Sequence, residues 1–197
     1  MKKIIIFAVT FLLLVNAKAQ QVHFGVKGGV NVSQLNFKNK TPSDSRVGLH
    51  LGVLAHIHTA SKSWAVQPEL LYSMEGAQKV GNSSLKYELN YLNLPVLLQY
   101  MFDNGFRLEA GPQINFLLNA KRKSGGVSTD YDAFKSVSFS LPVGLGYLTT
   151  SGLGFDARYV FGLSNINDND NGTSIHSNVF QLGIFYQFSD PKIRSRH

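Results

Sequence analysis

Six charged residues alternate with bulky apolar side chains, so an extended chain separates the two groups onto opposite faces. They are Lys27, Glu69, Arg107, Glu109, Asp156 and Arg158. Arg107 and Glu109 are two residues apart, as are Asp156 and Arg158, so each pair shares one face of a strand. If this face is turned to the interior, such charges must be paired or solvated, because unpaired burial costs several kcal/mol. The set predicts a structural plug of ion pairs; the alternatives are a gated ion path and a pair of catalytic carboxylates.

Enzymatic and metal chemistry have little support in the other residues. A glycosidase needs two carboxyl groups around a sugar-sized cleft, which this pattern does not predict. No G-x-S-x-G, P-loop or zinc-protease motif occurs. His23, His56 and His58 are expected near one another at strand ends, but no carboxylate or cysteine joins them by spacing. Residues 167–172 resemble a calcium loop in composition without its final glutamate. We expect a non-enzymatic protein with no metal and no cofactor.

These side chains must be positioned by β-strands, because apolar residues recur at every second position between clusters of Gly, Asn, Asp and Ser. The predicted strands span residues 21–33, 47–58, 64–75, 87–102, 106–119, 136–148, 153–164 and 178–188. One face of each strand bears bulky apolar residues, and the other is rich in glycine and in hydrogen-bonding side chains. Asp103, Asn104 and Gly105 supply the positive φ angles that a tight turn between the fourth and fifth strands needs.

The connections between these strands alternate between long and short. By these bounds they contain about 13, 5, 11, 3, 16, 4 and 13 residues. An outer-membrane barrel has short periplasmic turns and longer external loops. A soluble sandwich or lipocalin has no reason to keep every second turn tight. The sequence therefore predicts an all-β fold, an eight-stranded antiparallel up-and-down transmembrane β-barrel with both termini on the short-turn side.

Residue size predicts which face of the wall meets lipid. The interior of an eight-stranded barrel is just wide enough to be filled by side chains, so small and polar residues suit the lumen. A lipocalin would reverse the two faces, and the loop asymmetry favours the membrane barrel. Aromatic residues near the short-turn strand ends also fit a periplasmic girdle. They are Trp64, Tyr100, Phe102, Phe106, Tyr147, Phe155, Tyr186 and Phe188.

The N-terminus has the pattern of a cleaved signal peptide. Two lysines precede an apolar run over residues 4–15, and Ala17-Lys18-Ala19 supplies an A-x-A site. We expect cleavage after residue 19, a barrel over 20–188 and a short basic tail over 189–197. Cleavage removes three lysines and no acid, so the formal charge falls from +7 to +4. The remaining basic residues are scattered and no nucleic-acid-binding motif occurs, which argues against nucleic acid as a partner.

Four prolines and the absence of cysteine bear on stability. Without cysteine, stability must come from packing and backbone hydrogen bonds. Pro68, Pro95, Pro112 and Pro142 fall inside consecutive predicted strands, where each removes a ladder donor. They lie 4, 7, 6 and 6 residues from the nearest short turn. We expect a ring of kinks or bulges at one level of the wall.

Four segments carry a family resemblance. They are Phe24-Gly-Val-Lys-Gly-Gly-Val-Asn-Val-Ser33, Tyr91-Leu-Asn-Leu-Pro-Val-Leu-Leu-Gln-Tyr100, Leu108-Glu-Ala-Gly-Pro112 and Asp156-Ala-Arg-Tyr-Val-Phe-Gly-Leu-Ser-Asn165. The chain resembles the PorT-like outer-membrane β-barrels of Gram-negative bacteria, related in architecture to OmpX and the OmpA barrel, over about residues 22–188. The resemblance implies an outer-membrane location. The family's namesake is implicated in a secretion system that exports proteins across the outer membrane.

The expected function follows from this architecture. We expect a monomeric outer-membrane protein with a plugged polar lumen and a structural or surface-interaction role through its external loops. The alternatives are an accessory component of an outer-membrane protein secretion system and a small pore. Expected partners are outer-membrane lipid, lipopolysaccharide, and surface or secretion-complex proteins. Lys121, Arg122 and Lys123 are candidates to meet lipopolysaccharide phosphates at the outer surface, and the alternative for this triplet is simple solvation.

Overall fold

The computed structural model describes residues 22–38, 43–61, 63–78, 80, 85–125, 127–130, 133–168 and 174–188. The predicted signal peptide and the C-terminal tail lie outside the described residues, as does most of the calcium-loop-like segment. Within the described ranges, no helix is long and apolar enough to cross a membrane.

The described residues form β-strands that close into a ring. The strands are β1 (Val22–Phe37), β2 (Asp44–His58), β3 (Trp64–Gln78), β4 (Lys86–Met101), β5 (Phe106–Ala110), β6 (Gln113–Ser124), β7 (Val127–Asp130), β8 (Val137–Leu148), β9 (Leu153–Gly162) and β10 (Ile175–Gln187). Every pairing is antiparallel. The order β3-β2-β1-β10-β9-β8-β5-β4-β6-β7 closes through an additional β3–β4 pairing. β5 and β6 each pair with β4 on one side and with β8 on the other, so together they occupy one strand position in the wall. The ring therefore has eight strand positions, and the predicted fold class is confirmed.

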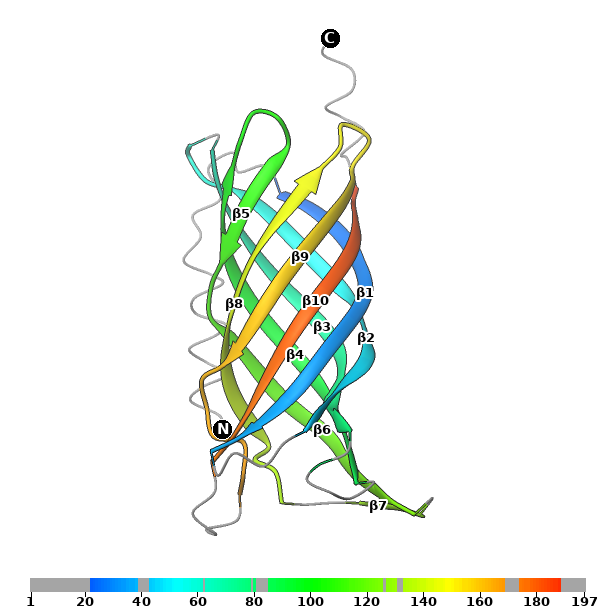
Figure 1. The fold of residues 1–197 in the computed structure, drawn as a ribbon. Helices are drawn as coiled ribbons and strands as arrows, with labels where there is room; N and C mark the ends of the chain where they lie inside the picture. The colour runs from blue at the N-terminus through cyan, green and yellow to red at the C-terminus, as the bar shows by residue number, and fades with distance from the viewer. Residues whose placement is uncertain are drawn as a thin grey trace.

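The two ends of the barrel differ, as the connection lengths predicted. Figure 1 shows the β4–β5 and β8–β9 turns at one end, at the top of the view, and β7 at the other. We call these the short-turn end and the loop end. In the two tight turns Gly105 and Gly152 adopt φ angles of 89° and 90°. Only glycine takes such angles readily, so these two residues allow the chain to reverse within a few positions.

The strands are longer at the loop end than the sequence predicted. The predicted strand 106–119 is divided at Gly111 and Pro112 into β5 and β6, and β6 continues to Ser124 before turning into β7. The predicted connection over residues 120–135 was therefore wrong for residues 120–124 and 127–130, which are strand. The ladder with β4 continues as far as Lys86 and Lys123. Outward side chains there are polar, so the apolar alternation that marks a strand disappears while the backbone pairing goes on.

The four prolines lie in one band across neighbouring strands, but the predicted bulges are absent from it. Pro68 pairs with Val96, the residue after Pro95, and Pro95 pairs with Gln113, the residue after Pro112. The carbonyl of Pro142 accepts a hydrogen bond from the backbone N–H of Gly111, the residue before Pro112. The pairing register is the same on both sides of each proline. The register shifts lie nearer the loop end, in the β2–β3 and β4–β6 ladders. A proline removes a donor toward one neighbouring strand, while adjacent residues still pair with the other.

The two faces of the wall divide as predicted. Large apolar side chains point outward, with Leu51 68% and Phe24 64% exposed, while inward polar residues such as Asn31 and Gln99 are fully buried. The predicted aromatic girdle consists of contacting pairs at the short-turn end. The rings of Trp64 and Tyr100 meet edge to face, with 5.0 Å between centroids. The outward face therefore suits lipid, and the inward face creates a polar core.

Candidate functional site

All six charged residues predicted to face the lumen do so, and we call them the ion-pair plug. Lys27 comes from β1, Glu69 from β3, Arg107 and Glu109 from β5, and Asp156 and Arg158 from β9. Each is between 2% and 5% exposed. Period-two alternation places them inward because each lies between outward apolar neighbours. The ring then brings four separate strands to one place in the lumen.

Arg158 is the centre of the ion-pair plug. Its Nη1 and Nη2 atoms each donate a hydrogen bond of 2.7 Å to a carboxylate oxygen of Glu69. Its Nε atom donates to Glu109. Lys27 binds Asp156 at 2.7 Å and lies 4.0 Å from Glu69. Five of the six charges thus form one connected network, in which every carboxylate is bound to a cation.

Arg107 joins this network through neutral groups. Its Nη1 atom donates to Gln99 at 3.4 Å, and Gln99 in turn donates to Glu109 at 2.8 Å. The guanidinium carbon of Arg107 lies 5.3 Å from the ring centroid of Phe185, a cation–π distance. The expectation that all six charges form ion pairs is thus met only in part, because Gln99 and Phe185 take the place of a carboxylate beside Arg107.

Inward glycines make room for the long side chains of the ion-pair plug. A Cβ atom on Gly183 would lie 2.9 Å from a carboxylate oxygen of Asp156 and 3.0 Å from Cε of Lys27. A Cβ atom on Gly144 would lie 2.7 Å from Cγ of Arg158. The contacts of 2.7 and 2.9 Å are shorter than Cβ atoms normally make, and the contact of 3.0 Å is tighter than most. The glycine-rich inward face noted in the sequence is therefore the space that the charged residues occupy.

A second layer of the lumen, toward the loop end, is held by hydrogen bonds between uncharged groups and one acid. Asn31 binds His50 at 2.8 Å and donates to Ser73 at 2.9 Å. Ser73 donates to Glu75 at 2.9 Å. Gln181 also donates to Asn31, at 3.2 Å. This layer links β1, β2, β3 and β10, and its hydrogen bonds were not predicted from the sequence.

A third layer closes the loop end with apolar side chains, and we call it the loop-end apolar cluster. Its buried members are Leu35, Ala77, Val80, Leu89, Tyr91, Ala120, Phe134, Ile166 and Ile175. This cluster was not predicted from the sequence. The available signal was a change along the inward positions, from polar near the short-turn end to Leu35 in β1 and Leu89 in β4.

The histidines at the short-turn end lie together as expected. The ring centroids of His56 and His58 are 4.7 Å apart, and those of His23 and His58 are 5.8 Å apart. His56 also contacts the side chain of Gln67 at 3.3 Å. The described part of the chain contains no group of three or more His, Cys, Asp or Glu residues that could hold a metal ion.

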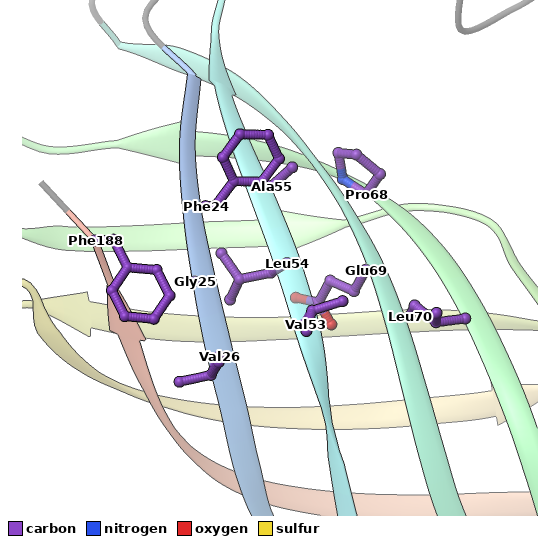
Figure 2. Close-up of a pocket in the computed structure, with 10 residues that line it drawn as sticks. All are labelled: Phe24, Gly25, Val26, Val53, Leu54, Ala55, Pro68, Glu69, Leu70 and Phe188. Carbon is purple, nitrogen blue, oxygen red and sulfur yellow. The ribbon is translucent and has the colours of Figure 1, made fainter. Parts of the chain in front are cut away.

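A hollow in the described structure lies on the outer wall of the barrel, over three neighbouring strands. Figure 2 shows it over β1, β2 and β3, lined by ten residues that include Phe24, Ala55, Pro68 and Phe188. Its volume is about 490 Å³ and its lining is mostly apolar. The carboxylate of Glu69 is turned inward to Arg158, so the hollow presents hydrocarbon to the bilayer. It forms part of the lipid-facing surface.

Comparison with known proteins places the fold among membrane barrels. Residues 18–168 match a family model described as outer membrane protein beta-barrel domain. No curated protein matches the chain. The structure is similar to Neisserial surface protein A, with a TM-score of 0.61 and 14% identity over 84% of this chain and 97% of that one. It is also similar to Ail, the attachment invasion locus protein of Yersinia pestis, solved in complex with the heparin analogue sucrose octasulfate. That match has a TM-score of 0.53 and 16% identity over 85% of this chain and 99% of Ail.

Proposed function

Because this chain belongs to the outer membrane protein β-barrel domain family and is a protein of the outer membrane, we propose that it has a structural or surface-interaction role with a closed lumen. The observation that carries this proposal is the filling of the lumen at two levels. The ion-pair plug bridges the barrel toward the short-turn end, and the loop-end apolar cluster fills it at the other end. A barrel filled in this way offers its outer surfaces for interaction.

The loop end is the proposed interaction surface. Short turns of such barrels face the periplasm and longer loops face outward, which points the loop end of this barrel away from the cell. The β4–β6 ladder carries Lys86, Lys121 and Lys123 there. Glu88 binds Lys123 at 2.9 Å and lies 3.5 Å from Arg46. Lipopolysaccharide phosphates are the proposed partners of these cations, because a strip of ammonium groups at the leaflet edge attracts them.

The other roles rank below this one. The PorT-like segments support an accessory part in an outer-membrane protein secretion system, which rests on the resemblance alone. A small pore ranks third because paired charges occupy the lumen. A non-enzymatic, monomeric protein is part of the proposal, since every carboxylate of the ion-pair plug is bound to a cation instead of standing ready for proton transfer.

Single cysteines provide the test, because the chain has none of its own. Ser128 in β7 and Asn104 in the β4–β5 turn are both exposed, at opposite ends of the barrel. In intact cells a membrane-impermeant maleimide cross-linker should label Ser128→Cys and leave Asn104→Cys unlabelled. Covalent adducts of the Ser128→Cys variant with lipopolysaccharide or surface proteins support the proposal. Adducts with an export complex favour the secretion role, and labelling of Asn104→Cys alone contradicts the orientation.

A further inference from the structure

We propose that the lumen holds one monovalent alkali cation, bound at Glu75 in β3 between the ion-pair plug and the loop-end apolar cluster. This inference goes beyond the proposed function, because it assigns a ligand to the interior of the barrel. Four observations carry it: the partners of Glu75, the charge balance of the lumen, a small cavity beside Glu75, and polar atoms around it that lack hydrogen-bond partners in the described structure.

The carboxylate of Glu75 is buried and bound by neutral groups. Glu75 is 6% exposed. Its Oε1 atom accepts hydrogen bonds from Ser73 at 2.9 Å and from the amide of Asn93 at 3.1 Å. Its Oε2 atom accepts one from Ser177 at 3.2 Å. These donors come from β3, β4 and β10 and carry no charge that could balance the carboxylate.

The remaining lumen charges among the described residues leave no cation for Glu75. The ion-pair plug contains three cations, Lys27, Arg107 and Arg158, and three carboxylates, so its formal charges cancel. Arg46 lies nearby, but its guanidinium binds the backbone oxygen of Glu75 and the carboxylate of Glu88. No described Lys, Arg or His forms an ion pair with the carboxylate of Glu75. A buried carboxylate without a counter-charge removes a large part of a protein's net stability.

A cavity of suitable size and chemistry adjoins this carboxylate. Its polar lining includes Glu75, Tyr91, Gln113, Asn115, Ser140 and Ser177. About 10 Å³ is open to the centre of a water-sized sphere, which is space for roughly one water molecule or one small ion. The polar lining residues include a carboxylate, a phenol, several serines and two amides, which all carry oxygen, the ligand atom that hard cations prefer.

Two buried oxygen atoms beside Glu75 lack a hydrogen-bond partner among the described residues. One is the hydroxyl of Tyr91, which is 2% exposed and lines the cavity. The other is Oδ1 of Asn93, whose amide nitrogen holds Glu75. Buried polar atoms normally find partners, so an unpaired hydroxyl at the wall of a carboxylate-lined cavity indicates a ligand there.

Charge and size favour a monovalent ion over a divalent one. One carboxylate and one alkali cation are neutral together, whereas calcium takes six to eight oxygens and magnesium retains several waters. The loop-end apolar cluster shares Tyr91 and Ile166 with the cavity lining. It therefore shields the ion from the solvent at the loop end.

The test is ion-specific stability of the refolded full-length protein in a zwitterionic detergent. Unfolding midpoints are compared in sodium chloride and in tetramethylammonium chloride at equal ionic strength, since the larger cation does not fit the cavity. We expect a midpoint that rises with sodium and saturates, as for a ligand that binds the folded state. Identical midpoints in the two salts at all concentrations overturn the proposal, because a protonated Glu75 or a bound water needs no sodium.

Variants locate the effect and separate it from surface screening. Glu75→Gln keeps the size and hydrogen bonding of the side chain and should abolish the sodium response. Tyr91→Phe keeps the ring in the apolar cluster and should require roughly tenfold more sodium, because one ligand to a charged group is lost. Asp103→Asn, which removes an exposed acid in the β4–β5 turn far from Glu75, should respond like the wild type. A full sodium response in Glu75→Gln overturns the proposal. If that variant does not fold, the ²³Na NMR linewidth of the wild-type protein decides, since broadening must appear in the folded protein and vanish in urea.

Discussion

Arg158 and Glu69 are bound to each other across the full width of the barrel. Two hydrogen bonds of 2.7 Å join the guanidinium and the carboxylate, which are 89 residues apart in the sequence. Their strands, β9 and β3, are four strand positions apart in either direction around the eight-stranded ring. The two strands therefore lie on opposite walls of the barrel. This pair therefore ties the two walls together and fills the lumen between them.

Removing the cation from this pair should destabilise the barrel. Arg158→Met leaves Glu69 and Glu109 buried with fewer cations, and we expect a loss of about 3–5 kcal/mol in the free energy of unfolding. Urea unfolding of the refolded protein, followed by the fluorescence of Trp64, measures it. Arg158→Met combined with Glu69→Gln should lose less, because one unpaired carboxylate is also removed. Equal stability of Arg158→Met and wild type would refute the structural role of the pair.

The ion-pair plug also predicts electrical behaviour. Wild-type protein should give no stable current steps in planar bilayers, because bound charges fill the lumen. Shortening the crossing side chains in Glu69→Ala/Arg158→Ala should produce such steps. Glu88→Gln, which changes charge on the outer face at the loop end, should stay silent. Regular conductance in the wild type would instead raise the pore to first place among the functions.

Gly183 and Gly28 offer a matched test of the space around the ion-pair plug. An added methyl at Gly183 meets Asp156 and Lys27 at 2.9–3.0 Å, whereas one at Gly28 meets its nearest atoms at 3.4 and 3.6 Å. We expect Gly183→Ala to cost about 1–3 kcal/mol from overpacking. Gly28→Ala should stay within about 0.5 kcal/mol of wild type. Comparable urea midpoints for the two variants would show that the plug tolerates the extra volume.

Local alternation was enough to predict which residues enter the lumen, because the period of two is set by each strand alone. It placed Lys27, Glu69 and Arg158 inward before any pairing was known. The interaction partners of these side chains could not be predicted from the sequence. Barrel closure and strand register decide that Arg158 meets Glu69 and that Arg107 lies against Phe185. The loop end was predicted least well. There the outward residues become polar and the inward ones apolar, so the pattern that marks a membrane strand is lost while the ladder continues.

The loop-end apolar cluster should stabilise the loop end. Leu89 is fully buried in it, whereas Leu118 is an exposed leucine on the neighbouring strand β6. Leu89→Ala should cost about 2–5 kcal/mol, the usual range for a buried leucine. It should also speed proteolysis at the loop end, because the cluster joins β1, β3, β4, β6 and β10. Leu118→Ala should change neither property much, and equal protease sensitivity of the two variants would contradict the role of the cluster.

Trp64, the single tryptophan, reports the orientation of the wall in the bilayer. Its ring lies on the outward face at the short-turn end, 40% exposed and against Tyr100. Aromatic side chains at that position rest at the level of the lipid headgroups. Lipids brominated near the headgroup should therefore quench its fluorescence more than lipids brominated near the chain end. The urea-unfolded chain serves as the control and should show no such preference. An indole turned into the lumen would be quenched by neither kind of brominated lipid. An indole at the bilayer centre would be quenched more by the lipids brominated near the chain end. The measurement therefore distinguishes the aromatic girdle from both arrangements.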